Sequence, residues 1–311
     1  MAFYMGIDVG GTSVKGIILK ENGEVVCEGD VPTVIGEGLA DCIETLAEKL
    51  VRSAGTVFSK IKGAGVGCPG MIDSKNGVVV FAGNLELKNY PLKKLLEESL
   101  GIPVKICNDA NAAALGEAKF GAGKNYKDSV LVTLGTGVGG GIVIDGKLFE
   151  GYKSAGAEIG HTVIEYGGLK CTCGRRGCFE VYCSARALTL QTKSAMADDT
   201  SSAMWKTYNH DNADGRTAFE YMDTDRTARL VVEKYLRYLA CGITNIANIF
   251  RPEIVMIGGG VAAQGTRLSE PVQKMLNEEL FGGTDFAPVK VACATLGGKA
   301  GAYGAAALQM K

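Results

Sequence analysis

The stretch Met5–Leu19, MGIDVGGTSVKGIIL, decides the fold of this chain. A short β-branched run ends at Asp8, the turn Gly10-Gly11-Thr12 follows, and a second β-branched run completes a predicted β-hairpin. Backbone N–H groups of adjacent glycines can line up on phosphate oxygens, and the Asp8 carboxylate is a ligand suited to hydrated Mg²⁺. The hydroxyl of Thr12 and the charge of Lys15 would help to hold phosphates. The same residues also fit an ordinary hairpin turn without a ligand.

A second stretch at residues 129–148, SVLVTLGTGVGGGIVIDGKL, repeats this layout around Gly135-Thr136-Gly137. Its Gly135, Gly137 and Gly140 have the spacing of a dinucleotide fingerprint, which requires a helix after the turn. Here a β-branched run follows, so the pattern predicts strand, turn and strand and disfavours a nicotinamide dinucleotide. Two such hairpins predict an internally duplicated α/β fold that holds a nucleoside triphosphate between its halves.

The composition of the chain limits the classes of function that it can have. With 311 residues, 46% of them hydrophobic, the chain can form about two domains. The formal net charge of −1 offers no footprint for nucleic acid or for a membrane surface. Ten cysteines with no signal peptide and no long apolar run indicate a reducing cytoplasm.

Polar residues follow two predicted strands in the first half of the chain. Residues 36–54 and 90–101 have helical apolar spacing, and a strand near 78–83 ends at Asn84, which either contacts a polar ligand or closes a turn. The strand at 102–107 meets an Ala-rich helix at Asn108-Asp109. Asp109 is either the N-cap of that helix or a general base held at the carboxyl edge of a sheet.

The second half is predicted to be mainly helical. Residues 184–229 indicate helices interrupted by a loop at 209–215, where His210 is expected to be a solvated loop residue. An amphipathic helix at 230–250 ends before Pro252, and a buried strand then runs into three glycines. Gly259 and Gly260 could pack flat against adenine or ribose, or could simply form a loop that enters a helix.

The segment Glu158–Glu180, EIGHTVIEYGGLKCTCGRRGCFE, combines an imidazole with three closely spaced thiols. This donor set suits a closed, structural Zn²⁺ site. Ordinary reduced thiols are the alternative, since Cys-x-Cys is tighter than a zinc-finger knuckle. Gly174 and Gly177 would let the backbone wrap around an ion. The predicted zinc ligands are His161, Cys171, Cys173 and Cys178.

Together these motifs resemble the ROK family of repressors and sugar kinases, and within it the bacterial ATP-dependent glucokinases. The resemblance rests on GIDVGGTSVKG, GCPGMID, ICNDANAAALGE, LGTGVGGGIVIDG, AGAEIGH, CTCGRRGCFE and ANIFRPEIVMIGGGV, and covers nearly all of the chain. It implies the actin/hexokinase/Hsp70-like (ribonuclease H-like) two-domain fold with an interdomain cleft. We expect a small domain of residues 1–121 plus about 298–311, and a large domain of residues 122–297 that carries the zinc site.

The resemblance also implies roles for individual residues. Asp109 would be the general base for ATP-dependent phosphorylation of the 6-hydroxyl of a hexose, with Asp8 positioning Mg²⁺. The residues implied to hold sugar are Gly70, Asn84, Asn108, Asp109, Glu158, His161 and Glu180. Those implied to hold the nucleotide are Asp8, Gly10, Gly11, Thr12, Lys15, Gly135, Thr136, Gly137, Gly259 and Gly260. A cytoplasmic homodimer or homotetramer is the assembly that the resemblance implies.

Three alternatives remain at this point. The sugar could be N-acetylmannosamine, fructose or allose instead of glucose, because LELKNYPL after Asn84 lacks the Gly-Trp pair often found in glucokinases. A sugar-responsive repressor is disfavoured, since the first hairpin begins within a dozen residues and no basic arm precedes it. A silent sugar-binding module is also disfavoured, because it would not need Asp109 beside two phosphate hairpins.

Overall fold

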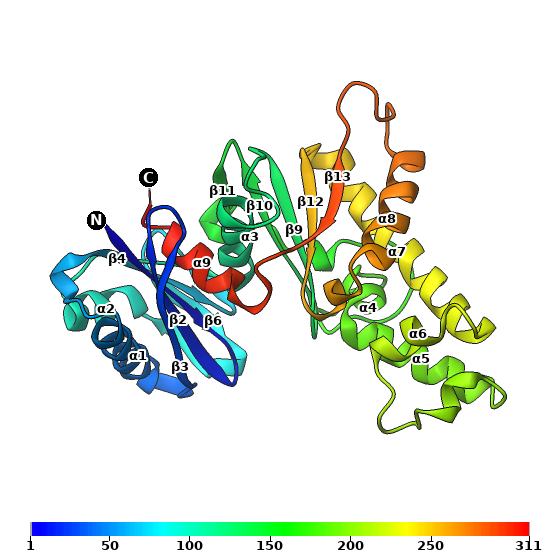
Figure 1. The fold of residues 1–311 in the computed structure, drawn as a ribbon, viewed down its shortest axis with the longest axis horizontal. Helices are drawn as coiled ribbons and strands as arrows, with labels where there is room; N and C mark the ends of the chain where they lie inside the picture. Colours follow the sequence, from blue (N-terminus) through cyan, green and yellow to red (C-terminus); the bar gives the residue numbers. More distant parts are fainter. Residues whose placement is uncertain (1, 311) are drawn as a thin grey trace. The chain divides into compact units, whose positions relative to one another are not determined.

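The computed structural model describes residues 2–310, which divide into two compact units (Figure 1). The first unit contains the residues up to Leu131, Gly141–Ala157 and the chain from Thr295 onward, and the second contains Val132–Gly140 and Glu158–Ala294. This division differs from the expected one, because residues 122–131 and 141–157 lie with the N-terminal unit. The physical reason is close packing on helix α3 (Asp109–Phe120): a Cβ added to Gly141 would lie 2.4 Å from the Cβ of Ala114.

A five-stranded sheet of order β3-β2-β1-β4-β8 forms the centre of the first unit. Its strands are β1 (Phe3–Val9), β2 (Ser13–Lys20), β3 (Val25–Pro32), β4 (Ile61–Cys68) and β8 (Val104–Asn108). β1 and β2 pair antiparallel, which confirms the predicted hairpin, while β4 runs parallel to both β1 and β8. A separate antiparallel sheet consists of β5 (Met71–Asp73), β6 (Val78–Ala82) and β7 (Leu87–Tyr90).

Helices cover both faces of the first sheet (Figure 1). α1 (Leu39–Ser53) and α2 (Leu92–Leu100) bury their apolar stripes on one face, as their spacing predicted. On the other face lies α9 (Ala300–Ala307), which approaches closely because its residues are all small except Tyr303. A Cβ on Gly65 of β4 would lie 1.7 Å from the carbonyl oxygen of Ala305, so this contact requires glycine.

A second five-stranded sheet has the order β11-β10-β9-β12-β13. Its strands are β9 (Ser129–Leu134), β10 (Val138–Ile144), β11 (Lys147–Phe149), β12 (Ile254–Gly258) and β13 (Lys290–Cys293). Counted along the chain, both sheets have the strand order 3-2-1-4-5, which confirms the predicted duplication. A strand follows the Gly135–Gly137 turn, as expected for a hairpin and contrary to a dinucleotide fingerprint.

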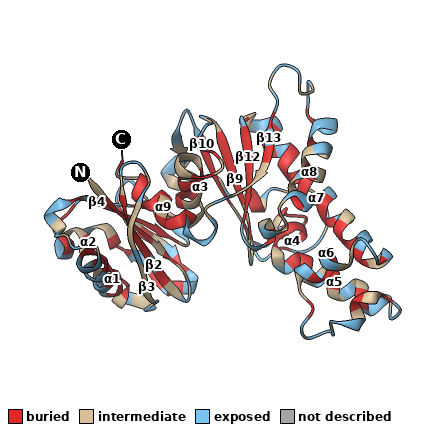
Figure 2. Cartoon of the chain, viewed as in Figure 1, coloured by how far each residue is buried: buried red, intermediate tan, exposed pale blue. Residues whose placement is uncertain are grey.

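The second unit is otherwise helical. Its helices are α4 (Glu180–Cys183), α5 (Ala185–Asp198), α6 (Gly215–Tyr221), α7 (Arg226–Phe250) and α8 (Thr266–Glu279). The central helix α7 buries one side, and its buried residues appear red between tan and pale blue ones in Figure 2. This buried side contacts the start of α4. The side chain of Phe179 packs against Gly242, and the Tyr235 hydroxyl donates to the carbonyl of Cys183 over 2.7 Å.

Short 3₁₀ turns connect these elements. They are η1 (Gly36–Gly38), η2 (Phe58–Lys60), η3 (Gly83–Leu85), η4 (Tyr152–Ser154), η5 (Ile159–His161), η6 (Ala203–Lys206), η7 (Gly260–Gln264) and η8 (Gly297–Lys299). The loop predicted between helices at 209–215 is present, and His210 is exposed in it, as expected. Across residues 2–310, the helices lack the combination of length and apolar character that a membrane crossing requires.

Candidate functional site

Strand pairing brings two carboxylates to one edge of the first sheet. Asp8 pairs with Gly67 of β4, and Cys68 pairs with Asn108 of β8, so β1, β4 and β8 end together. Asp109, the first residue of α3, follows directly. The structure therefore places Asp109 at the carboxyl edge of a parallel strand, where α/β proteins usually bind their ligands.

Burial raises the pKa values of both acids, and the charge of Asp109 adds to the rise at Asp8. The pKa of Asp8 is raised to about 6, first by burial and then by the charge of Asp109, with Lys15 acting in the opposite direction. Burial also raises the pKa of Asp109, although the N–H of Ala110 donates to its Oδ1 over 2.9 Å and favours the charged form. Two partly buried carboxylates repel each other, so a cation between their charges would stabilise both.

Asn108, and not Asp109, caps helix α3. Its Oδ1 accepts the backbone N–H groups of Ala110 at 2.9 Å and Asn111 at 3.2 Å, while its Nδ2 donates to the carbonyl of Gly70 over 3.2 Å. The interpretation of Asp109 as the N-cap is therefore wrong, since Asp109 is the first helical residue and the side chain of Asn108 before it caps the helix. This frees the Asp109 carboxylate from a purely structural task and ties Gly70 to the same edge.

The first hairpin turn is open on its outer side. The N–H of Gly10 donates to the carbonyl of Ser13 over 3.0 Å, and the Thr33 hydroxyl donates to the carbonyl of Gly10 over 2.7 Å. A Cβ on Gly11 would meet no atom within 4 Å. Thr12 and Lys15 are exposed beside this turn. The turn is thus rigid at its base and unobstructed where the sequence predicted phosphate oxygens. Asn84 lies exposed in η3 of the same unit.

In the second unit, Glu180 is fixed against the second glycine turn. Its Oε2 accepts the backbone N–H of Val138 over 3.0 Å, and a Cβ on Gly137 would lie 2.3 Å from that oxygen. The N–H of Ala185 donates to the carbonyl of Gly135 over 2.8 Å. A side chain at position 137 would therefore displace the Glu180 carboxylate. Thr136 stays exposed between these anchors.

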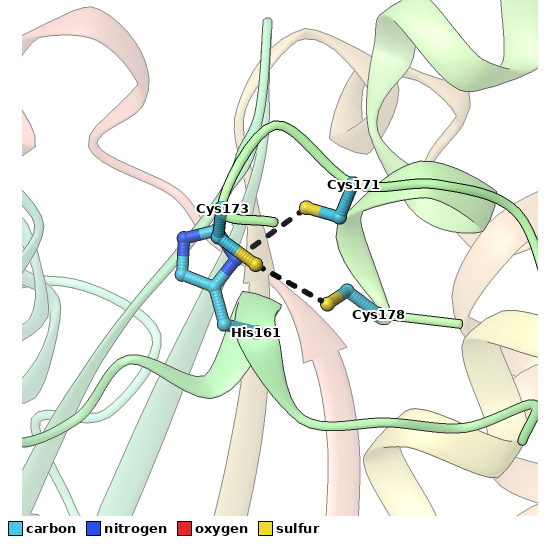
Figure 3. A group of neighbouring side chains, drawn as sticks. All are labelled: His161, Cys171, Cys173 and Cys178. Atoms are coloured by element: carbon cyan, nitrogen blue, oxygen red, sulfur yellow. Dashed lines mark hydrogen bonds between the residues drawn. The ribbon is translucent and has the colours of Figure 1, made fainter. Parts of the chain in front are cut away.

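The cluster of one imidazole and three thiols forms as the sequence predicted (Figure 3). The four candidate ligand atoms lie within 4.8 Å of one another. Nδ1 of His161 is 3.8 Å from Sγ of Cys171, and the sulfurs of Cys173 and Cys178 are 3.7 Å apart. In a tetrahedron with Zn–S bonds of about 2.3 Å and Zn–N bonds of about 2.0 Å, ligand atoms are separated by roughly 3.5–3.8 Å. The donor set and its spacing both fit Zn²⁺.

Glycines shape the loop around this cluster. Gly174 and Gly177 have φ values of +91° and +79°, which favour glycine, and a Cβ on Gly177 would lie 1.7 Å from the carbonyl oxygen of Glu165. Burial and the neighbouring thiols raise the pKa of Cys178 to about 12, so its thiolate would need a cation. Cys171 Sγ also lies 3.9 Å from Oε1 of Glu180. The Glu180 carboxylate therefore lies directly beside the cluster of thiols and imidazole.

Other predicted residues have simpler surroundings. Glu158 is exposed, immediately before η5, and its carbonyl accepts the N–H of His161 over 3.1 Å. Gly259 has a φ of +80°, and a Cβ there would lie 2.3 Å from the carbonyl oxygen of Leu134, so packing on β9 accounts for this glycine. Gly260 is open on its outer side. A nucleotide role remains a prediction for both.

Two polar groups that the structure reveals were not predicted from the sequence. Glu150 interacts with Ser74 in the first unit, and Glu117 is fully buried in α3 among backbone donors. An acid directly after a short strand was the available signal for Glu150. Glu117 had none, because it occupies an ordinary position within an Ala-rich helix.

Comparison with known proteins identifies the family. The model of the ROK family matches residues 4–311. The chain belongs to the ROK family. The glucokinase of Halalkalibacterium halodurans is 38% identical to this ROK protein over 97% of this chain and 93% of its own. The crystal structure of a ROK family glucokinase from Streptomyces griseus, in complex with glucose and AMPPNP, is 34% identical with a TM-score of 0.82, covering 99% of both chains.

Regulators belong to the same group of relatives. The xylose repressor of Caldicellulosiruptor bescii is 33% identical over 89% of this chain and 70% of the repressor. The actin/hexokinase-like α/β fold expected from the motifs is confirmed by the similarity to the Streptomyces griseus structure and by the repeated strand order.

Proposed function

We propose that this ROK protein is an ATP-dependent hexose kinase that converts glucose to glucose 6-phosphate. Its similarity to glucokinases extends over nearly the whole chain, and one of them was crystallised with glucose and a nucleotide analogue. The observation that carries the proposal is the position of Asp109, a partly buried acid at the carboxyl edge of the first sheet, beside Asp8 and the open glycine turn.

In the proposed reaction Asp109 accepts the proton of the sugar's 6-hydroxyl. The O6 atom then forms a bond to the γ-phosphorus of ATP while the bond from that phosphorus to the bridging oxygen breaks, and ADP leaves with the electron pair. Bound Mg²⁺ would neutralise charge on the phosphates. Asp8 would hold it, and Lys15 with the turns at 10–12 and 135–137 would cradle phosphate oxygens. Most of the acceleration in phosphoryl transfer comes from such alignment and charge stabilisation.

We assign recognition of the sugar hydroxyls to Gly70, Asn84, Asn108, Glu158, His161 and Glu180. The contacts of Asn108 support the assignment only in part, because its Oδ1 is used by the helix cap and one Nδ2 hydrogen by Gly70. One N–H of the Asn108 amide is left for a ligand. Since Nδ1 of His161 faces Cys171, Nε2 is the ring nitrogen available to a sugar.

Zinc is proposed to be structural. With His161 and the three cysteines as ligands, a tetrahedral ion has no open position for a substrate. The ion would fix the His161 ring and the loop that leads to Glu180. We also propose a cytoplasmic homodimer or homotetramer. The ten cysteines, all free thiols, support the reducing compartment, and light scattering of the purified protein would determine the oligomeric state.

The decisive experiment measures ADP release with ATP and Mg²⁺ on a panel of glucose, N-acetylmannosamine, fructose and allose. Glucose should give the highest kcat/KM. A tenfold advantage for another sugar would show that glucose is the wrong substrate, and no turnover with any hexose would remove the kinase assignment.

Asp109→Asn tests the role of the general base. We expect kcat to fall by about 10²–10⁴-fold, the usual contribution of such a base, with glucose affinity by calorimetry nearly unchanged. Asp211→Asn, the same change in an exposed loop, is the matched control. In the wild type, kcat should fall at acid pH with an apparent pKa above that of an ordinary aspartate, because burial raises the pKa of Asp109.

A further inference from the structure

The segment that leads into Glu158 has a strained backbone. Lys153, Ser154 and Ala157 have φ values of +53°, +58° and +65°, in the left-handed region that side chains with a Cβ disfavour. Each such residue costs on the order of 1 kcal/mol or more, and such strain persists only where surrounding contacts over-determine it. The contacts that hold residues 152–157 in this conformation should therefore be identifiable.

Three side chains provide these contacts. The Ser74 hydroxyl, directly after β5, donates to Oε2 of Glu150 over 2.9 Å, and the hydroxyl oxygens of Ser74 and Ser154 are 2.6 Å apart. Each hydroxyl has one hydrogen to donate. Since Ser74 uses its hydrogen on Glu150, Ser154 must donate to Ser74. We call this directional chain, from Ser154 through Ser74 to Glu150, the serine relay.

The backbone closes the same loop. The N–H of Gly156 donates to the carbonyl of Glu150 over 2.8 Å, so Glu150 holds the segment through both its side chain and its main chain. Ser74 is 76 residues from Glu150 and 80 residues from Ser154 in the sequence. The relay therefore ties residues 150–156 to a different part of the first unit.

Stability alone does not explain the relay. Oε1 of Glu150 is buried without a hydrogen-bond partner among the described residues. Burial raises the pKa of Glu150, while the Ser74 hydrogen bond opposes this rise. An unsatisfied buried acceptor costs about 1–3 kcal/mol. Strain and an unpaired acceptor together are typical of a segment whose conformation serves function.

We propose that the serine relay positions Glu158 for sugar binding by fixing the strained backbone that ends at Ala157. This inference rests on the proposed function, in which the Glu158 carboxylate contacts the sugar. Ser74, Glu150 and Ser154 are positioning residues, because they act through the backbone that precedes Glu158. A relaxed segment would present the Glu158 carboxylate in many orientations, so binding sugar would cost additional conformational entropy.

The test compares Ser74→Ala, which removes the relay, with Ser74→Thr, which retains a hydroxyl. Two quantities are measured on the intact protein: the rate of trypsin cleavage after the exposed Lys153, followed by mass spectrometry, and the KM and kcat for glucose. We expect Ser74→Ala to be cleaved at least fivefold faster and to raise the glucose KM about tenfold, with kcat within twofold and the KM for ATP unchanged. Ser74→Thr should restore both values, and Ser59→Ala, the same change on an exposed turn, should match the wild type.

Each outcome decides the proposal. A Ser74→Ala variant with the cleavage rate and glucose KM of the wild type would overturn it. Faster cleavage with an unchanged glucose KM would also overturn it, since the relay would then hold the segment without positioning Glu158. If Ser74→Ala does not fold, Ser154→Ala serves instead, because it leaves the Ser74–Glu150 hydrogen bond intact. It should raise the cleavage rate and the glucose KM by smaller factors. No change in either quantity would overturn the proposal. If the wild type phosphorylates no hexose, the proposed function fails, and sugar positioning fails with it, while the cleavage rates still decide whether the relay holds the segment.

Discussion

Replacing Glu117 tests how one buried carboxylate supports the first unit. Glu117 is fully buried in α3, and its Oε2 accepts the N–H of Ala122 at 2.9 Å and both the N–H and the hydroxyl of Thr295, at 3.1 and 3.4 Å. Its Oε1 accepts the N–H of Leu296 at 2.7 Å. The carboxylate therefore joins the end of α3 to the segment that precedes α9, 178 and 179 residues away in the sequence.

The expected cost of Glu117→Gln follows from these bonds. The amide oxygen of glutamine can replace Oε2, but its NH₂ group then takes the place of Oε1. The N–H of Leu296 therefore loses its acceptor and faces a second donor. A hydrogen bond to a charged group contributes about 1.5–3 kcal/mol. Removing the buried charge offsets part of this loss, because a carboxylate in the interior carries a desolvation penalty. We expect a net loss of about 2 kcal/mol in the free energy of unfolding, and a larger loss for Glu117→Ala, which also creates a cavity.

Hydrogen exchange with mass spectrometry measures this effect where it occurs. Peptides that contain Ala122, Thr295 and Leu296 should lose protection in Glu117→Gln, and urea denaturation followed by far-UV circular dichroism should give the free energy. Fluorescence of Trp205, the sole tryptophan, would report on the second unit instead. Glu98→Gln, the same change on the exposed face of α2, is the control. Equal stability of the two variants, within about 0.3 kcal/mol, would refute the reasoning, since surface changes stay below about 0.5 kcal/mol.

Three further predictions concern the metal and the carboxylates. Purified protein should contain one zinc ion per chain. The Cys173→Ala variant should lack zinc and should either have a higher glucose KM or have an unfolded second unit. A zinc-free protein with normal glucose KM and normal stability would contradict this. Asp8 binds its proton more tightly in the folded state, with a pKa of about 6 against 3.8 for an ordinary aspartate. The stability that the protonated Asp8 contributes is therefore lost as pH rises from about 4 to 6, by at most about 3 kcal/mol. Asp8→Asn, unfolded in EDTA without nucleotide, should therefore be more stable than the wild type at pH 8 while losing kinase activity, and an unchanged or lower stability would disprove the burial argument. Gly137→Ala should weaken protein stability by displacing Glu180, measured by thermal unfolding, whereas Gly11→Ala should leave it nearly unchanged.

Local patterns were enough to predict the regular elements near the site. The run around Gly10-Gly11-Thr12 alternates as a hairpin does, and the Gly135–Gly137 turn is followed by a β-branched strand, so strand-turn-strand could be read from neighbouring residues. The ligand cluster was equally visible, because His161 and Cys178 are 17 positions apart within one glycine-rich loop. Each of these patterns is encoded within a single element or loop.

The choice between neighbouring residues was not predictable in the same way. Both Asn108 and Asp109 are good N-cap residues, and the chain gives no local reason to prefer one. The structure decides for Asn108 because the pairing of Cys68 with Asn108 ends β8 there and aligns its amide with Gly70. Packing of β10 on α3 likewise decided the domain division, and the order of residues along the chain does not predict that packing.

The sequence by itself determined the duplicated α/β pattern, the two glycine turns and the composition of the metal cluster, since these depend on residue types at short spacing. Only the tertiary structure decided which acids share an edge with Asp109, that Gly137 lies against the Glu180 carboxylate, and how the serine relay and Glu117 are satisfied. These contacts include hydrogen bonds between residues 42, 76 and 179 positions apart. Their geometry follows from how helices and strands pack, and a one-dimensional pattern does not specify that packing.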